Sequence, residues 1–328
     1  MKLYLICFLI LGGVLFFTPE KKYPSRPAYH AGFDINAYLE LHSFNSTSLK
    51  PSIALKNKTI IDTSGILGVL KVRPVWVTGL ESNGDGYALN SQAPSNQLGK
   101  RSSVKILNNS TLVFEELVIG GAGDNTHIGH GGNTAGLWDE THGWQIQMAN
   151  LADSGVISNP VSLIQVSQGG STIANWGIGS YYPAYDANYF ARDLLKQRLD
   201  TGLAQIVRGN GGVHPPIYMP WTHGINDIIA GTPVATWKAG TIELINWIRT
   251  TYPLNKVVVI MVKIPPSVGG AYVAYNSAIE QICSELPNVH YVEVADLTMR
   301  EPNHFDDPAF RMIFNRIVQK LIDNGHPL

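Results

Sequence analysis

The stretch Val72-Arg-Pro-Val-Trp-Val-Thr-Gly-Leu-Glu-Ser-Asn-Gly-Asp-Gly86 decides how the chain folds. Its first half is a β-rich apolar run, and its second half is a turn in which Gly79, Gly84 and Gly86 surround Ser82. Buried strands that alternate with helices form a parallel sheet covered on both faces. Ligands of such sheets bind beyond the carboxyl ends of the strands. The stretch therefore predicts an α/β fold with a ligand site near Ser82.

The same pattern of strand, turn and helix continues to the end of the chain. Further β-rich runs occupy residues 162–167, 217–221, 256–262 and 289–294. Apolar residues recur at helical spacing in the segments between and after them, which predicts helices over residues 137–153, 187–208, 234–252, 272–285 and 307–323. We therefore expect a three-layer α/β/α sandwich with a central, mainly parallel five-stranded sheet, built from residues 71–328.

Composition narrows the function. The chain has 328 residues, of which 45% are hydrophobic and 15% charged, so it is long enough for one large core. A formal net charge of −1 gives no basic surface for nucleic acid. The two cysteines, Cys7 and Cys283, cannot form a disulfide framework or a cysteine zinc site. We expect no metal and no cofactor.

The N-terminus differs from the rest of the chain. Lys2 precedes about fifteen apolar residues, which is typical of an export signal or a short membrane anchor over residues 1–22. A buried helix is the third alternative. Residues 23–70 contain several prolines, serines and asparagines and are interpreted as a linker or accessory segment. The sequence thus predicts an exported protein that is secreted, periplasmic or at the cell surface, with possible membrane attachment through this apolar segment.

Ser82 is the first candidate for chemistry. An activated serine needs an exposed turn, a histidine base, a group that orients the base, and donors for the oxyanion. The Ser82 turn alone is also compatible with a plain solvated turn. Gly169 and Gly170 follow the run 162–167 and could offer backbone N–H groups, or form an ordinary turn. Asn226 follows the run 217–221 and could donate its amide, or cap a helix.

Glu301-Pro-Asn-His304 lies just before the last predicted helix. A carboxylate three residues ahead of a histidine can reach its Nδ1 atom and fix the tautomer of the ring. The alternative is a surface histidine that precedes a helix start at Asp306 and Asp307. A glycine-rich stretch, 120–132, holds His127 and His130. No carboxylate cluster stands at ligand spacing there, so we favour a flexible loop over a metal site.

The order of these segments resembles the SGNH (GDSL-like) hydrolases, and within them the branch of sialate O-acetylesterases and acetyl xylan esterases. That branch shows Gly-Gln-Ser-Asn-Met-x-Gly, a Gly-Gly-Thr/Ser turn, Trp-x-Gln-Gly-Glu-Ser-Asp and Asp-x-x-His-Phe. The corresponding segments of this chain begin at Leu80, Gln168, Trp221 and Glu301. The resemblance covers about residues 72–325.

The resemblance implies roles for individual residues. Ser82 would be the nucleophile, His304 the base and Glu301 its acidic partner. The oxyanion hole would consist of the Ser82 N–H, a Gly169 or Gly170 N–H and the Asn226 amide. The candidate substrate contacts are His223, Trp221 and Asn83. The chain departs from the branch pattern at several positions, among them Glu81 for Gln, His223 for Gln, Ile225 for Glu and Glu301 for Asp.

The resemblance further implies a serine esterase that hydrolyses small O-acyl esters, O-acetyl above all, on carbohydrate. Three alternatives stay open at this point. The first is an inactive glycan-binding or structural surface protein with the same fold, which the departures favour. The second is a lipase or thioesterase of the same superfamily. The third is a membrane-anchored enzyme on a cell or virion surface.

Overall fold

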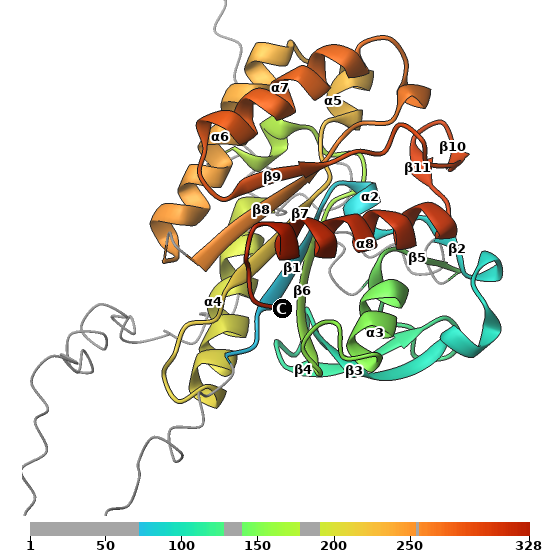
Figure 1. The fold of residues 1–328 in the computed structure, drawn as a ribbon, viewed down its shortest axis with the longest axis vertical. Coiled ribbons are helices and arrows are strands. Elements are labelled where there is room, and N and C mark those ends of the chain that lie inside the picture. Colours follow the sequence, from blue (N-terminus) through green and yellow to red (C-terminus); the bar gives the residue numbers. More distant parts are fainter. Residues whose placement is uncertain (1–71, 128–139, 178–190, 254–255) are drawn as a thin grey trace, which may run out of the picture. The chain divides into compact units, whose positions relative to one another are not determined.

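A computed structural model describes residues 72–127, 140–177, 191–253 and 256–328 (Figure 1). The predicted export signal or anchor (1–22) and the linker (23–70) lie outside the described residues, as does His130. No helix within the described ranges is both long and apolar enough to span a bilayer.

The centre of the domain is a seven-stranded sheet with the order β4-β3-β6-β1-β7-β8-β9. Five of its strands coincide with the predicted runs: β1 (Val75–Leu80), β6 (Val161–Ser167), β7 (Ile217–Trp221), β8 (Val257–Val262) and β9 (Val289–Val292). All five pair in parallel with their neighbours. The α/β class and the mainly parallel sheet are therefore confirmed.

The predicted number of five strands is wrong, because two more strands extend one edge of the sheet. β3 (Gly99–Leu107) pairs in parallel with β6, and β4 (Phe114–Ile119) closes the edge in the antiparallel direction. β3 carries a polar run, Lys100-Arg-Ser-Ser103, and β4 carries Glu115 and Glu116. Charged residues are typical of strands at or near a sheet edge, and they hide the apolar pattern that reveals buried strands.

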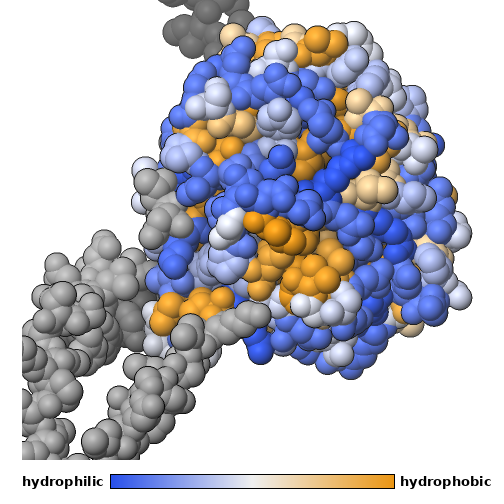
Figure 2. Space-filling view, viewed as in Figure 1, coloured by the Kyte–Doolittle hydropathy of each residue, from blue (hydrophilic) through white to orange (hydrophobic). Residues whose placement is uncertain are grey.

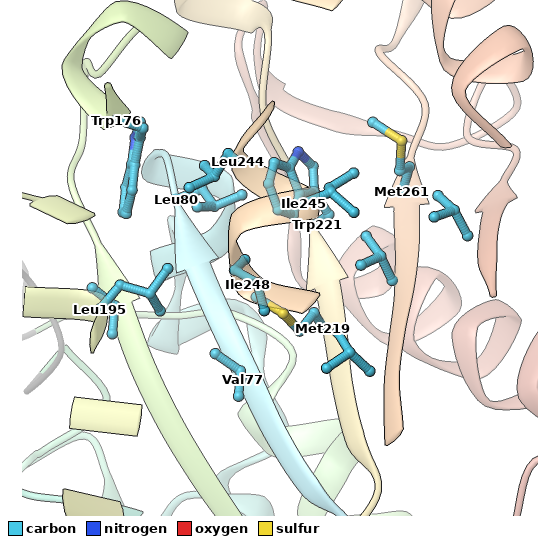
Figure 3. Packing of buried hydrophobic residues seen from close by; sticks show 14 of the residues in the cluster. Val77, Leu80, Trp176, Leu195, Met219, Trp221, Leu244, Ile245, Ile248 and Met261 are labelled. Carbon is cyan, nitrogen blue, oxygen red and sulfur yellow. The ribbon is translucent and has the colours of Figure 1, made fainter. Parts of the chain in front are cut away.

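Helices cover both faces of the sheet (Figure 1). α4 (Ala191–Gly209), α6 (Val234–Thr251) and α7 (Tyr272–Glu285) contribute to one hydrophobic core, and α3 (Gln145–Asp153) and α8 (Asp307–Asp323) to the other. Val75 and Val77 of β1 belong to the first core and Trp76 to the second, as the alternation of side chains along a strand requires. Figure 3 shows part of the first core, with Leu195 beside β6 and Ile248 between β1 and β7. The three-layer prediction is confirmed.

The predicted helices agree closely with α4, α6, α7 and α8 where the structure describes them. The exception is the predicted helix 137–153, whose helical part begins only at Gln145. Thr141 and His142 instead form the short strand β5, which pairs with β2 (Ala88–Leu89). This small pair lies next to the Ser82 turn in the chain and fixes the path of the backbone behind it.

The surface is mixed in character. Figure 2 shows this face as mainly hydrophilic, with apolar side chains gathered in a few areas. The large apolar side chains that are exposed are spread along the described chain, and two of them lie on α8: Val113, Val156, Val213, Ile229, Val273, Met312 and Ile322. Single exposed apolar residues of this kind are normal on a protein surface.

Candidate active site at the carboxyl ends of the strands

Ser82 opens α2 (Ser82–Asp85), a single helical turn directly after β1. The turn is so tight that a Cβ atom on Gly84 would lie 1.7 Å from the Gly79 carbonyl oxygen. A Cβ atom on Gly79, whose φ is +138°, would lie 1.8 Å from the Val166 carbonyl oxygen of the neighbouring strand. Only glycine fits at both positions. These two glycines therefore allow the Ser82 turn (residues 79–86) to pack against β6.

Asp85 anchors the other end of the Ser82 turn. Its side chain is fully buried, and its Oδ1 atom accepts hydrogen bonds from Ser167 Oγ at 2.6 Å and Gln165 Nε2 at 2.8 Å. The Oδ2 atom lies 3.4 Å from His127 Nδ1. Burial lowers the pKa of His127, but the charge of Asp85 and its hydrogen bond outweigh this effect, so the pKa of His127 is raised. A buried carboxylate with several donors is rigidly held. Asp85 thus fixes α2 to β6.

His304 comes from the distant end of the chain. It lies in the His304 hairpin, formed by β10 (Met299–Glu301) and β11 (His304–Phe305), just before α8. Its Nε2 atom is 2.8 Å from Ser82 Oγ, and its Nδ1 atom is 2.5 Å from Glu301 Oε1. The structure therefore brings Ser82, His304 and Glu301 together in one hydrogen-bonded chain, called here the Ser–His–Glu chain.

The base and the acid of the Ser–His–Glu chain, His304 and Glu301, differ in exposure. The His304 side chain is 16% exposed and the Glu301 side chain 47%. Burial lowers the pKa of His304, the nearby positive charge of Arg300 lowers it further, and Glu301 acts in the opposite direction, with a net shift below the usual value. The imidazole is therefore neutral at neutral pH and able to accept a proton from Ser82.

Asn83 joins the Ser82 turn to the His304 hairpin. Its Nδ2 atom donates to the Asn303 carbonyl at 2.8 Å, and its Oδ1 atom accepts from the Phe305 N–H at 3.3 Å. The side chain is 1% exposed. Asn83, predicted as a substrate contact, is thus placed as a bridge that holds Ser82 and His304 at a fixed separation.

Tyr87 stacks on His304, a contact that the sequence analysis missed. The two ring centroids are 4.1 Å apart and the ring planes are inclined by 19°. Arg300 Nη1 donates to the Tyr87 carbonyl at 2.6 Å, and the guanidinium carbon lies 5.0 Å from the centroid of the tyrosine ring. The sequence shows an aromatic residue five positions after the serine, but it does not indicate that this ring contacts His304.

Glu81 lies between β1 and α2, at the position where the branch pattern has glutamine. Its Oε2 atom accepts from the Gly224 N–H at 3.2 Å and from Asn226 Nδ2 at 3.3 Å. Burial and the neighbouring charge of Asp227 raise the pKa of Glu81 to about 8, so the carboxyl is neutral at neutral pH. Burial likewise raises the pKa of Asp227 to about 6. The carboxyl of Glu81 therefore ties the Ser82 turn to the segment that follows β7.

The predicted oxyanion donors differ in the partners that the structure gives them. Ser82 is the first residue of α2, where a backbone N–H has no partner within the helix. The turn at Gly169 and Gly170 packs against β1, because Gln168 N–H donates to the Leu80 carbonyl at 3.0 Å. Asn226 is the exception, since its amide donates to Glu81 and its side chain does not line the pocket described next.

A small pocket of about 190 Å³, including its open mouth, lies between the Ser82 turn, the end of β7 and the His304 hairpin. Its lining is partly apolar: Ile225, Val262, Ile264 and Phe305, together with Glu81, Asn83, Thr222, His223 and Lys263. The three departures from the branch pattern at positions 81, 223 and 225 thus line one pocket.

His223 presents a hydrogen-bond donor among these lining residues. Trp237 Nε1 donates to its Nδ1 atom at 3.2 Å, so in the neutral ring the proton lies on Nε2. Burial lowers the pKa of His223 to about 3, which keeps the ring neutral. The Nε2 atom is buried and has no hydrogen-bond partner among the described residues.

Trp221 does not reach the site. Its side chain is 1% exposed and belongs to the hydrophobic core, where Figure 3 shows it at the end of β7. The prediction of Trp221 as a substrate contact is therefore wrong. The reason is that helices cover both faces of the sheet, so all five residues of β7 are buried.

Within the parts of the chain that the structure describes, no three side chains of histidine, cysteine, aspartate or glutamate are grouped as metal ligands. His127, from the glycine-rich stretch, instead contacts Asp85 and the Thr141 carbonyl, the latter at 2.9 Å. The rest of that stretch, from residue 128, lies outside the described residues.

Comparison with solved structures supports the fold. A protein from Arabidopsis thaliana is 18% identical, with a TM-score of 0.57, and NanS is 13% identical, with a TM-score of 0.53; each match covers 77% of this chain and 98% of the other. A carbohydrate acetylesterase from Xanthomonas citri is 13% identical over 77% of this chain and 57% of its own, with a TM-score of 0.50. No curated protein matches this chain in sequence.

Comparison with protein families is more specific. The model of the family described as carbohydrate esterase, sialic acid-specific acetylesterase, matches residues 140–323, which is more than half of the chain. The matched part contains the ends of β6 and β7 and the His304 hairpin, and Ser82 lies ahead of it. The chain belongs to the sialic acid-specific acetylesterase family of carbohydrate esterases.

Proposed function

We propose that the protein is an esterase that removes small O-acyl groups, O-acetyl above all, from carbohydrate, with Ser82 as the nucleophile. The observation that carries the proposal is the Ser–His–Glu chain, in which 222 positions separate Ser82 from His304 and yet Oγ and Nε2 are 2.8 Å apart. A serine, a neutral imidazole and an orienting carboxylate in this order are what nucleophilic acyl transfer requires.

The geometry supports a reaction in two stages. As Ser82 Oγ attacks the acyl carbon, His304 Nε2 takes the hydroxyl proton, and Glu301 stabilises the resulting imidazolium through Nδ1. When the tetrahedral intermediate collapses, His304 returns the proton to the sugar oxygen that leaves. Water then attacks the acyl-Ser82 ester with the same histidine as base, and acetate is released.

The oxyanion needs donors fixed in advance, each worth about 3 kcal/mol of transition-state stabilisation in well-studied cases. We assign the Ser82 N–H and a Gly169 or Gly170 N–H to this task, since both turns lie at the carboxyl ends of adjacent strands, β1 and β6. Asn226 is a weaker candidate than the sequence suggested, because Glu81 already accepts a hydrogen bond from its amide.

The substrate class rests on the family. The family is described as specific for sialic acid acetyl esters, and one solved structure of similar fold is described as a carbohydrate acetylesterase. Export to a place where polysaccharides occur is part of the same proposal.

The test compares wild type with Ser82→Ala on para-nitrophenyl acetate and on O-acetylated N-acetylneuraminic acid, with acetate release as the readout. We expect hydrolysis of both by wild type and loss of both in the variant. Ser171→Ala is a suitable control, since its hydroxyl donates to the Leu80 carbonyl and not to His304. Equal rates in wild type and Ser82→Ala would contradict the proposal, and a preference for long acyl chains would replace it with a lipase.

A further inference from the structure

Arg300 is a cation beside the Ser–His–Glu chain that has no part in the proposed reaction. It lies on β10, one residue before Glu301. Its Nη1 atom donates to the Tyr87 carbonyl, and its guanidinium group lies over the Tyr87 ring, as given above. Two contacts therefore hold the guanidinium in place, so little side-chain entropy remains to be lost when a ligand binds to it.

Within the described ranges, Arg300 has no ion-pair partner. No carboxylate among the described residues lies within ion-pair distance of it, whereas four other arginines, Arg101, Arg192, Arg311 and Arg316, each have one. A guanidinium has five N–H donors in a planar fork, and the described residues use only a donor on Nη1. The side chain is partly exposed. A charged, rigid and accessible donor set thus remains for a ligand.

Arg300 is linked through Tyr87 to the Ser–His–Glu chain, at which the substrate would bind. Tyr87, which holds the guanidinium, stacks with its ring on His304, and His304 is hydrogen-bonded to Ser82. Ser82 and His304 do not line the small pocket, and the Glu301 side chain beside them is 47% exposed. We therefore expect the ring of a sugar whose ester lies at Ser82 to occupy the exposed side, where Glu301 and its neighbour Arg300 are found. A carboxylate on that sugar matches the guanidinium in charge and in its paired geometry.

We propose that Arg300 binds the carboxylate of an acidic sugar while Ser82 attacks an acyl ester on the same molecule. This inference rests on the proposed function and adds to it the residue that reads the charge of the substrate. Sialic acids and uronic acids share the required group, a carboxylate attached to the sugar ring.

The experiment uses the full-length chain and two pairs of substrates. Each pair consists of an O-acetylated acidic sugar, N-acetylneuraminic acid or galacturonic acid, and its methyl ester, in which the charge is masked. We expect wild type to hydrolyse the free acid with kcat/KM about tenfold above that of the methyl ester, a ratio equivalent to about 1.4 kcal/mol. Arg300→Gln should remove this preference through KM, and Arg300→Lys should keep part of it.

Two controls separate this proposal from the proposed function. Arg208→Gln removes the same charge from an exposed position in the last turn of α4 and should leave the preference unchanged. Arg300→Gln should still hydrolyse para-nitrophenyl acetate at a pH above the acid limb of the profile, which shows that Ser82 and His304 are intact. Wild type that hydrolyses no acetyl ester contradicts the proposed function instead.

The outcomes are decisive for Arg300. A preference for either free acid that Arg300→Gln abolishes supports the proposal, and the acid that shows it identifies the source of the carboxylate. Equal hydrolysis of acid and methyl ester by wild type, for both sugars, overturns it. A preference that Arg300→Gln retains also overturns it, because another group then reads the charge.

Discussion

Two glutamates flank the Ser82–His304 pair, and their surroundings are opposite. Glu301, on the His304 hairpin, is 47% exposed on its side chain and hydrogen-bonds to the imidazole. Glu81, directly after β1, is 1% exposed as a residue and accepts hydrogen bonds from Gly224 and Asn226. The exposed carboxyl is placed to orient the histidine through Nδ1. The buried carboxyl, whose pKa is raised to about 8, is neutral at neutral pH and joins two strand ends.

The site therefore has two parts, one that carries the reacting groups (the chemical side) and one that holds them in place (the structural side). On the chemical side, the His304 hairpin brings a base to Ser82, and the required contacts are few and partly exposed. On the structural side, Glu81, Asp85 and Asn83 hold the Ser82 turn through buried hydrogen bonds to β7, β6 and the hairpin. Substitutions on the first side should therefore alter rates, and those on the second should alter stability.

The largest effect is expected on the chemical side, from His304→Ala. Loss of the base should lower kcat/KM for para-nitrophenyl acetate by about 10³-fold or more, the range found for general bases in a serine mechanism. The free energy of unfolding should change little. His326→Ala is the control, since that histidine pairs with His290 at 3.3 Å and should leave the rate unchanged. Activity that survives His304→Ala would contradict the assignment of His304 as the base.

The next largest effect is expected on the structural side, from Glu81→Gln, and it concerns stability. The pKa of Glu81 rises from 4.5 to about 8 on folding, so the folded state holds the proton more tightly. Its contribution to stability is complete below pH 4.5 and is lost as the pH rises toward 8. The variant stays neutral at every pH and should be more stable than wild type at alkaline pH, by up to about 5 kcal/mol.

Urea unfolding of wild type and Glu81→Gln across this pH range measures the effect. Glu301→Gln is the matched control, because it removes a half-exposed carboxyl from the same site. Unfolding curves of wild type and Glu81→Gln that stay parallel at every pH would show that Glu81 is ionised in the folded chain.

A smaller effect on the rate is expected from Glu301→Gln. An exposed ion pair is worth about 1 kcal/mol, so kcat should fall about tenfold at most. Glu301 raises the pKa of His304, and its removal should therefore move the acid limb of the pH–rate profile to lower pH. Arg300→Gln should move the same limb to higher pH. A limb that stays in place in both variants would show that these charges do not act on the imidazole.

The smallest effect is expected from the ring that stacks on His304. Aromatic pairs contribute about 0.5–1.5 kcal/mol, so Tyr87→Leu should lower kcat by roughly two- to tenfold with KM unchanged. Tyr87→Phe keeps the ring and should retain the wild-type rate. Equal loss in both variants would assign the effect to the tyrosine hydroxyl rather than to stacking.

Much of the fold could be predicted from the sequence because buried strands and amphipathic helices carry strong periodic patterns. β3 and β4 were missed because their lysines and glutamates resemble those of loops. The site was predicted from the order of segments, since parallel strands bring their carboxyl ends to one edge of the sheet. The partner of Asn226, the burial of Trp221 and the stacking of Tyr87 depend on side-chain directions that the order of segments does not specify.

The most direct test of the account is covalent labelling with a reactive phosphonate ester, read by mass spectrometry of the digested full-length chain. We predict one adduct, on Ser82, that forms in step with loss of esterase activity and fails to form in Ser82→Ala and at acid pH, where His304 is protonated. A protein that hydrolyses acetyl esters but carries the label on another residue, or loses activity with Ser82 unmodified, would contradict the assignment of Ser82 as nucleophile.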